Sequence, residues 1–312
     1  MTSSLVGQDH VPVLLEEVLE NLLTTSSGIY CDATFGRGGH SRAILDRLSP
    51  EGRLIALDQD PQAIAVGAEY ARREPRLSIH QARFSGLGQV LAEQGVAQLQ
   101  GVLMDIGVSS PQLDDPQRGF SFTDGPLDMR MNPQEGDSAA TWINDADEDE
   151  IVKVLRTHGE ERNAKRIARA IVAARPLSRT SELAELVADA VPAAVRRRAS
   201  KHPATQTFQA IRIHINAELE DLRRVLDESI DLLAPGGRLV VISFHSLEDR
   251  MVKQFMRREA KGDPLPAHVP IQEKDIKRRL RLCGKAVKAD KEEVDRNPRA
   301  RSAVMRIAEK LG

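Results

Sequence analysis

The sequence predicts an α/β fold in which a mostly parallel β-sheet carries an inserted all-helical domain. Short apolar runs alternate with helix-like stretches through the first third of the chain, and this alternation is typical of a parallel sheet that helices cover on both faces. Helical patterns with little strand signal then continue to residue 204. Beyond them, the almost fully apolar run "RLVVISF" indicates a strand in the middle of a sheet.

Four strands are expected before residue 112, from the runs "GIYCDATF", "GRLIALD", "RLSIHQARF" and "GVLMDIG". A helix is expected from about Gly39 to Leu48, between the first two strands. The next helix should open at Asp60-Pro61, because aspartate is a good helix cap and proline is favoured in the first turn.

The pattern changes after Pro111, where a loop with several glycines and prolines leads into segments rich in Ala, Glu and Arg. A long helix is then expected from Thr205, because apolar residues recur every three to four positions, and Pro235-Gly236-Gly237 should end it. We therefore expect a sheet domain formed by residues 1–112 and 205–312, and an inserted helical domain for substrate recognition, residues 113–204.

Composition narrows the class of protein. With 312 residues, of which 41% are hydrophobic, the chain can bury a large core. No apolar run approaches the roughly 18 residues of a membrane helix, and "MTSSLVGQDH" lacks the basic and apolar regions of a signal peptide, so we expect a cytoplasmic protein without a membrane partner. The two cysteines, Cys31 and Cys283, lie far apart and indicate neither a disulfide framework nor a metal site.

Charge is distributed unevenly along the chain. Residues 250–312 hold 18 Lys and Arg against 9 Asp and Glu, a net charge of +9 in a chain whose total is −2. Such a basic segment predicts a polyanionic partner, because cations that neutralise phosphates release counterions. A solvated charged face is an equally simple alternative. Further basic residues near the end of the helical insertion are Arg196, Arg197, Arg198 and Lys201.

A glycine-rich turn, "CDATFGRGGH", follows the first expected strand. Ligands of open parallel sheets bind at the carboxyl ends of the strands, where the first strand meets its helix, and glycines there let the backbone approach a ligand. Gly36 and Gly38 fit part of a dinucleotide fingerprint, but the third glycine position is Ser41, so this match is weak.

Three aspartates end expected strands at the same edge of the sheet. Asp32 would repel a pyrophosphate but attract the ammonium group of S-adenosylmethionine. Asp58 lies at the interval from the glycine turn at which a carboxylate reaches the hydroxyls of an adenosine ribose, and Asp105 ends the fourth strand. Aspartates are also common there as turn formers and helix caps, but three beside one glycine turn favour a cationic cofactor over NAD.

Eight blocks of sequence resemble the ribosomal RNA small-subunit methyltransferase H family, in family order and over nearly the whole chain. They are "HVPVLLEEVL", "DATFGRGGHS", "LDQDPQAI", "DIGVSSPQLD", "RGFSF", "TFQAIRIHINAEL", "ISFHSLEDR" and "NPRARSA". The resemblance implies a class I (Rossmann-like) S-adenosylmethionine-dependent methyltransferase with a helical insertion. The implied reaction is N4-methylation of a decoding-centre cytosine. The implied partner is 16S rRNA within the small ribosomal subunit, and a homodimer is one possible assembly.

The same motifs imply a cofactor-binding set drawn from the glycine turn, the strand ends and the loop after the fourth strand: Gly38, Gly39, His40, Asp58, Phe84, Asp105 and Gln112. In this resemblance the first three line the methionine end of S-adenosylmethionine, Asp58 holds the ribose and Phe84 lies against the adenine.

The cytosine amine needs hydrogen-bond acceptors more than a strong base, because its lone pair is delocalised into the ring. Asp105 is the expected catalytic acceptor, with the backbone after it or the hydroxyl of Ser109 or Ser110 as alternatives. The aromatic residue that often follows such an acidic residue in amino-methyltransferases is missing, and Phe120 or Phe122 is a candidate to replace it.

Other functions stay open from the residues alone. The glycine turn permits an NAD-dependent oxidoreductase, and the basic segments permit a non-catalytic RNA-binding assembly factor. The residues alone also permit a methyltransferase of the same fold that acts on DNA or protein. Only the family resemblance argues against this alternative. No metal site is expected, because the histidines show no ligand spacing with Cys, Asp or Glu.

Overall fold

The computed structural model describes residues 12–197, 201–262 and 276–312. The chain packs into two compact units, which are residues 1–107 with 221–312, and residues 108–220. These limits differ from the division expected after residues 112 and 204. The helix α11 (Thr205–Ile215) lies in the second unit, because its apolar residues Phe208 and Ile211 belong to that unit's core.

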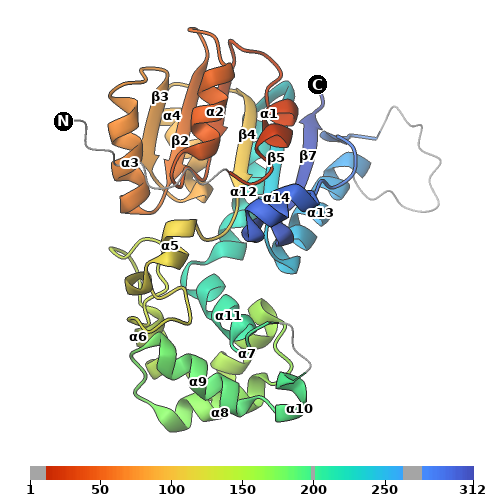
Figure 1. Cartoon of the computed structure of the whole chain (residues 1–312). Helices are drawn as coiled ribbons and strands as arrows, with labels where there is room; N and C mark the ends of the chain where they lie inside the picture. The colour runs from red at the N-terminus through yellow and green to blue at the C-terminus, as the bar shows by residue number, and fades with distance from the viewer. Residues whose placement is uncertain (1–11, 198–200, 263–275) are drawn as a thin grey trace, which may run out of the picture. The chain divides into compact units, whose positions relative to one another are not determined.

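The first unit contains a seven-stranded sheet in the order β3-β2-β1-β4-β5-β7-β6 (Figure 1). Its strands are β1 (Ile29–Asp32), β2 (Arg53–Asp58), β3 (Leu77–Gln81), β4 (Leu99–Asp105), β5 (Leu233–Ser243), β6 (Leu280–Leu282) and β7 (Val304–Lys310). The first five are parallel, whereas β7 runs antiparallel between β5 and β6. This confirms the predicted α/β fold with a mostly parallel, Rossmann-like sheet.

Helices cover both faces of this sheet, and alternate strand residues point to opposite faces. One face packs on α1 (Leu15–Leu22), α2 (Gly39–Arg47) and α3 (Pro61–Ala71). The other packs on α4 (Leu87–Glu93), α12 (Glu218–Leu232) and α13 (Ser246–Lys261). In β2, for example, Leu54 and Ala56 belong to the first core, and Ile55 and Leu57 to the second. The short helix α14 (Lys291–Arg296) precedes β7.

The second unit is helical in its described residues, apart from an isolated bridge between Pro126 and Arg179. Besides α11 its helices are α5 (Ser110–Asp114), α6 (Ala139–Asp145), α7 (Glu148–Gly159), α8 (Ala164–Ala174), α9 (Thr180–Ala190) and α10 (Ala193–Arg196). The apolar faces of α6, α7, α8, α9 and α11 form one core, so this unit has its own interior.

The single long helix expected from Thr205 is two helices, because the chain turns at Asn216 and Ala217. The Asn216 side chain accepts a hydrogen bond from the backbone N–H of Met131 (2.7 Å) and donates one to the carbonyl of Met129 (2.8 Å). Ala217 takes a left-handed φ of 51°. These tertiary bonds interrupt a helix that the apolar periodicity alone would continue.

The segment Pro235-Gly236-Gly237 also differs from its expected role. The helix α12 already ends at Leu232, and the strand β5 starts at Leu233, so the proline and glycines lie within the strand. Among the described residues, no helix combines the length and the apolar character needed to cross a bilayer.

Candidate active site at the carboxyl edge of the sheet

The glycine turn connects β1 to α2 and is shaped by close packing within the chain. Gly38 has a left-handed φ of 75°, and a Cβ there would come within 2.6 Å of the Phe35 ring. A Cβ on Gly39 would come within 2.4 Å of the Pro12 ring. Gly36 also has a positive φ (57°), but a Cβ there would meet mainly open space. The fold itself therefore requires glycine at 38 and 39, and the open side of the turn is at Gly36.

Asp32, at the end of β1, is satisfied by donors of its own turn. Its Oδ2 accepts from the hydroxyl of Ser41 (2.6 Å) and its Oδ1 from the backbone N–H of Thr34 (3.1 Å). The side chain is 1% exposed, and burial raises its pKa. Ser41, which breaks the dinucleotide fingerprint, thus serves to hold this carboxyl group. The attraction of Asp32 for a ligand ammonium group, which the sequence suggested, stays a prediction.

Asp58, at the end of β2, holds the turn from the other side. One carboxyl oxygen accepts from the backbone N–H of Gly36 (2.7 Å) and the other from that of Asp60 (2.8 Å). Burial raises the pKa of this carboxyl group to about 6. Each oxygen has a further lone pair, so the group can still accept bonds from two neighbouring hydroxyls of a ligand.

Asp105, at the end of β4, has a carboxyl oxygen without a partner. Its backbone N–H donates to the hydroxyl of Thr34 (2.7 Å), which joins β4 to the glycine turn. Its Oδ1 is buried and has no hydrogen-bond partner among the described residues. Burial raises the pKa of Asp105 to about 6. A buried acceptor of this kind is costly unless something else binds it, so Asp105 has an acceptor that a ligand donor could satisfy.

His40 faces Asp105 from the first turn of α2. Its Nδ1 lies 3.7 Å from the Asp105 Oδ2, and its Nε2 lies 3.0 Å from the carbonyl oxygen of Val13. A carbonyl only accepts, so Nε2 carries a proton, and Nδ1 is the ring nitrogen that faces Asp105. Attraction to a protonated His40 partly offsets the effect of burial on the pKa of Asp105. Next to Val13, the backbone N–H of Leu14 donates to the Glu293 carboxylate at 2.7 Å, which fixes the segment that holds His40.

Phe84 follows β3 and starts the 3₁₀ turn η1 (Phe84–Gly86). The ring is half-buried against the core that α4 and α12 share. Its two neighbours are tied to Asp221, which accepts from the Arg83 guanidinium (3.1 Å) and from the Ser85 hydroxyl (2.9 Å). The carboxyl edge of the first unit thus brings together six of the predicted residues: Gly38, Gly39, His40, Asp58, Phe84 and Asp105.

Gln112 is the predicted residue that lies in the other unit. It is buried in α5, where its side-chain oxygen accepts from the backbone N–H of Ser109 (2.9 Å) in a capping box. Phe120 is 8% exposed in the core of that unit. Phe122 stacks on His202 with ring centroids 4.3 Å apart and packs edge-on against Phe208. Both phenylalanine rings are thus already in contact with side chains of their own unit.

Sequence reasoning assigned no role to the turn after β5, where His245 precedes α13. The backbone N–H groups of Phe244 and His245 donate to Glu248 Oε2 at 3.0 and 3.2 Å, and His245 Nε2 lies 3.0 Å from Glu248 Oε1. Glu248 is fully buried, and its charge adds to burial in raising the pKa of Asp105. In the sequence, a helix-cap residue followed three positions later by a glutamate predicts the start of a helix, and this pattern could have pointed to the turn.

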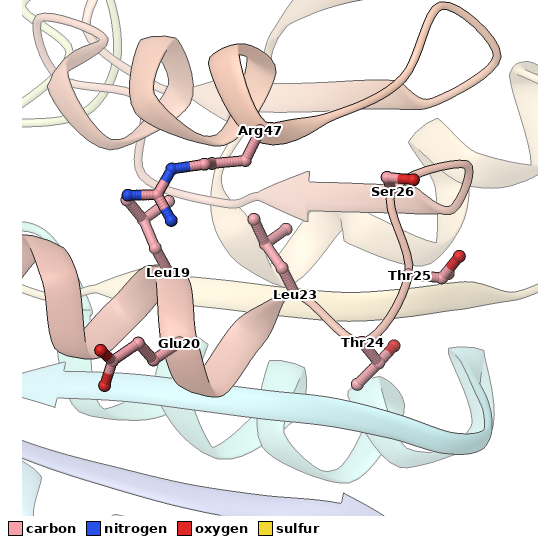
Figure 2. Close-up of a pocket in the computed structure, with 7 residues that line it drawn as sticks. All are labelled: Leu19, Glu20, Leu23, Thr24, Thr25, Ser26 and Arg47. Atoms are coloured by element: carbon pink, nitrogen blue, oxygen red, sulfur yellow. The ribbon is translucent and has the colours of Figure 1, made fainter.

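A surface depression lies at the opposite edge of the sheet (Figure 2). Its lining comes from α1, the segment before β1 and the end of α2: Leu19, Glu20, Leu23, Thr24, Thr25, Ser26 and Arg47. These residues lie at the amino end of β1, whereas the glycine turn and the aspartates lie at the carboxyl ends of the strands. The depression and the candidate active site are therefore separate.

The basic C-terminal segment uses several of its arginines within the first unit. Arg258 pairs with Asp227 (2.8 Å), Arg279 with Asp231 (2.6 Å), and Arg306 with Asp249 (2.7 Å). Arg281 likewise pairs with Glu309. Part of this segment, residues 263–275, and Arg198 of the helical insertion lie outside the described residues. The net charge of the segment therefore overstates how many cations it presents to a partner.

The two cysteines are free, with Cys31 buried and Cys283 partly exposed. The described residues contain no group of three or more His, Cys, Asp or Glu side chains arranged to hold a metal ion.

Comparison with known proteins identifies the family of the chain. The MraW methylase family matches residues 7–311. A protein of Thioalkalivibrio sulfidiphilus called "Ribosomal RNA small subunit methyltransferase H" is 57% identical over 97% of both chains. Proteins of the same name from Xanthomonas euvesicatoria and Thiobacillus denitrificans are each 56% identical, over 97% of this chain and 89% and 97% of theirs. The chain therefore belongs to the MraW methylase family.

Proposed function

We propose that this protein uses S-adenosylmethionine to methylate the exocyclic N4 amine of a decoding-centre cytosine in 16S rRNA. Family membership supports methyl transfer, and the relatives' names support small-subunit ribosomal RNA as the substrate. The structural observation that carries the site assignment is the buried, unpartnered Oδ1 of Asp105 beside the glycine turn.

The residues at the carboxyl edge fit S-adenosylmethionine. Asp58 has free lone pairs for two ribose hydroxyls, and Phe84 offers a ring face at the end of β3. Gly38, Gly39 and His40 would lie along the methionine end, where Gly36 leaves the turn open. Gln112 lies in the second unit, and its proposed role in cofactor binding rests on the family resemblance alone. When bound, S-adenosylmethionine supplies an electrophilic methyl group on a sulfonium.

Asp105 is the proposed catalytic residue. Its carboxylate accepts an N4–H hydrogen bond, which orients the amine lone pair and stabilises the positive charge that develops on nitrogen. With a pKa of about 6, the group is ionised at neutral pH but still accepts a proton readily. His40 lies beside this carboxyl group, with its Nδ1 3.7 Å from the Asp105 Oδ2, which is beyond direct hydrogen-bond distance.

The cytosine must leave its stack to reach this edge, because a stacked base does not expose its amine to a cleft. An aromatic content of only 3% argues against a surface built from stacked rings. We therefore propose that the protein recognises the shape of the folded small subunit, with the helical unit and the basic C-terminal segment contacting phosphates.

The test is nucleoside mass spectrometry of 16S rRNA from cells with and without this gene. We expect N4-methylcytosine to disappear on deletion and to return when the purified protein and S-adenosylmethionine are added to the deficient subunits. An unchanged modification pattern would overturn the proposal. Restoration of subunit assembly without methyl transfer would instead favour the non-catalytic assembly factor, and binding of NAD in place of S-adenosylmethionine would favour the oxidoreductase.

A further inference from the structure

The helix α8 presents a row of exposed cations, most of which make no ion pair with the described residues. Arg162, just before the helix, and Lys165, Arg166 and Arg169 within it are exposed. Their spacing of three, four and seven residues places them on one face. The opposite face, with Ala164, Ile167, Ala168 and Ile171, is buried in the core of the second unit. We call the four cations the α8 basic face.

Acidic partners are nearly absent from this face. The sequence of α8, "AKRIARAIVAA", contains no acid. Arg162, Lys165 and Arg166 make no ion pair within the described part of the chain, and the contact of Arg169 with Glu148 is long, at 3.9 Å. The neighbouring Glu161 is buried and accepts from the backbone N–H of Asn163 at 2.7 Å. The α8 basic face thus differs from the C-terminal segment, where arginines pair at 2.6–2.8 Å.

Helix stability does not explain this arrangement. Lys165 and Arg166 lie in the first turn of α8, where the partial positive charge of the helix dipole repels cations by roughly 0.3–1 kcal/mol each. No acid in that turn offsets the repulsion, and Asn163 provides no side-chain cap. An external polyanion is the simplest group that would turn this unfavourable cluster into a favourable one.

We propose that the α8 basic face binds the phosphate backbone of ribosomal RNA and holds the substrate against the helical unit. This inference rests on the proposed function for the identity of the RNA. Guanidinium and ammonium groups on one exposed face contact phosphates without reading bases. The face therefore contributes affinity and orientation, whereas the choice of the cytosine belongs to the sheet unit.

The test compares two triple variants that each remove three cations. The first is Arg162→Gln, Lys165→Gln and Arg166→Gln on the α8 basic face. The control is Arg47→Gln, Arg72→Gln and Arg73→Gln, three exposed arginines of the first unit that already pair with Glu16 or Glu69. Binding to small subunits from the deletion strain, and to protein-free 16S rRNA, is measured as a function of salt concentration.

The α8 variant should bind both RNA probes roughly tenfold or more weakly, and the slope of log affinity against log salt should fall by about 2, since each phosphate contact contributes about 0.7–0.9. The control should keep the wild-type slope. The thermal midpoint of the α8 variant should stay unchanged or rise slightly, because a repulsion is removed. S-adenosylmethionine binding should be unaffected.

Equal slopes for the two variants would overturn the proposal, as would a marked fall in the thermal midpoint of the α8 variant. A loss confined to intact subunits would point to a ribosomal protein as the partner and would also overturn it. Failure of the proposed function is separately visible, because the wild-type protein would then bind RNA with the same α8 dependence but transfer no methyl group.

Discussion

The ends of β1 and β4 carry the same residue type at the same edge of the sheet, yet the two carboxyl groups differ in their surroundings. Asp32 at the end of β1 accepts from the Ser41 hydroxyl and the Thr34 N–H, and both of its oxygens are occupied. Asp105 at the end of β4 keeps a buried oxygen without a partner in the described structure. Donors from the chain's own turns thus give Asp32 and Asp58 a part in shaping the glycine turn, whereas Asp105 keeps one oxygen for which the described residues supply no donor.

Replacing Asp105 should have the largest effect on catalysis. Asp105→Asn keeps the shape but removes the charge that stabilises the developing cation, so the single-turnover rate of methyl transfer should fall by roughly 10²–10⁴-fold. The thermal midpoint should stay the same or rise, because a buried, poorly satisfied carboxylate is removed. The control is Asp46→Asn on the exposed side of α2, which should change neither quantity. If Asp105→Asn unfolds or transfers methyl groups at the normal rate, Asp105 does not differ from Asp32 in acting on the ligand.

Replacing Asp32 should instead affect stability. Asp32→Ala leaves the buried Ser41 hydroxyl without its acceptor and frees the Thr34 N–H, which should lower the free energy of unfolding by about 2 kcal/mol. Denaturant unfolding measures this change, and the single-turnover rate of the folded fraction should fall far less than in Asp105→Asn. If Asp32→Ala keeps the wild-type stability but loses methyl transfer completely, both aspartates act on the ligand.

The smallest expected effect is a change in pH dependence. Asp58 and Asp105 have pKa values of about 6, above the value of about 3.9 for an unfolded aspartate. The native protein therefore holds protons that the unfolded chain releases, and the free energy of unfolding should fall as pH rises from about 4 to about 6. Methyl transfer should rise over the upper part of that range, because protonated Asp105 is a poorer acceptor. In Asp105→Asn, the free energy of unfolding should fall less steeply over this pH range. An unaltered pH dependence would mean that another group titrates there.

Most of the sheet unit could be predicted from the sequence, because its strands are marked by short apolar runs that are local in the chain. Apolar runs marked the first five strands, and the aspartates at the ends of β1, β2 and β4 followed from them. The antiparallel strands β6 and β7 were not predicted, because β6 has three residues and β7 lies in a charged segment. The break in the expected long helix depends on bonds from Asn216 to residues far away in the sequence, which periodicity does not report.

Within the candidate site, residue types were predictable but their bonding was not. Nothing in the local sequence distinguishes Asp32 from Asp105, because the difference comes from the Ser41 hydroxyl on α2 and from the absence of a matching donor near β4. The tautomer of His40 depends on the carbonyl of Val13, 27 positions away.

The late position of β7 in the chain has a consequence for biosynthesis. β7 is made last, but it pairs with β5, the neighbour of the strand that ends at Asp105. Until the ribosome has released Val304–Lys310, one side of β5 remains an open edge, and open strand edges pair readily with other chains. A nascent or truncated chain that stops before β7 is therefore exposed to aggregation through β5, the strand beside the candidate active site.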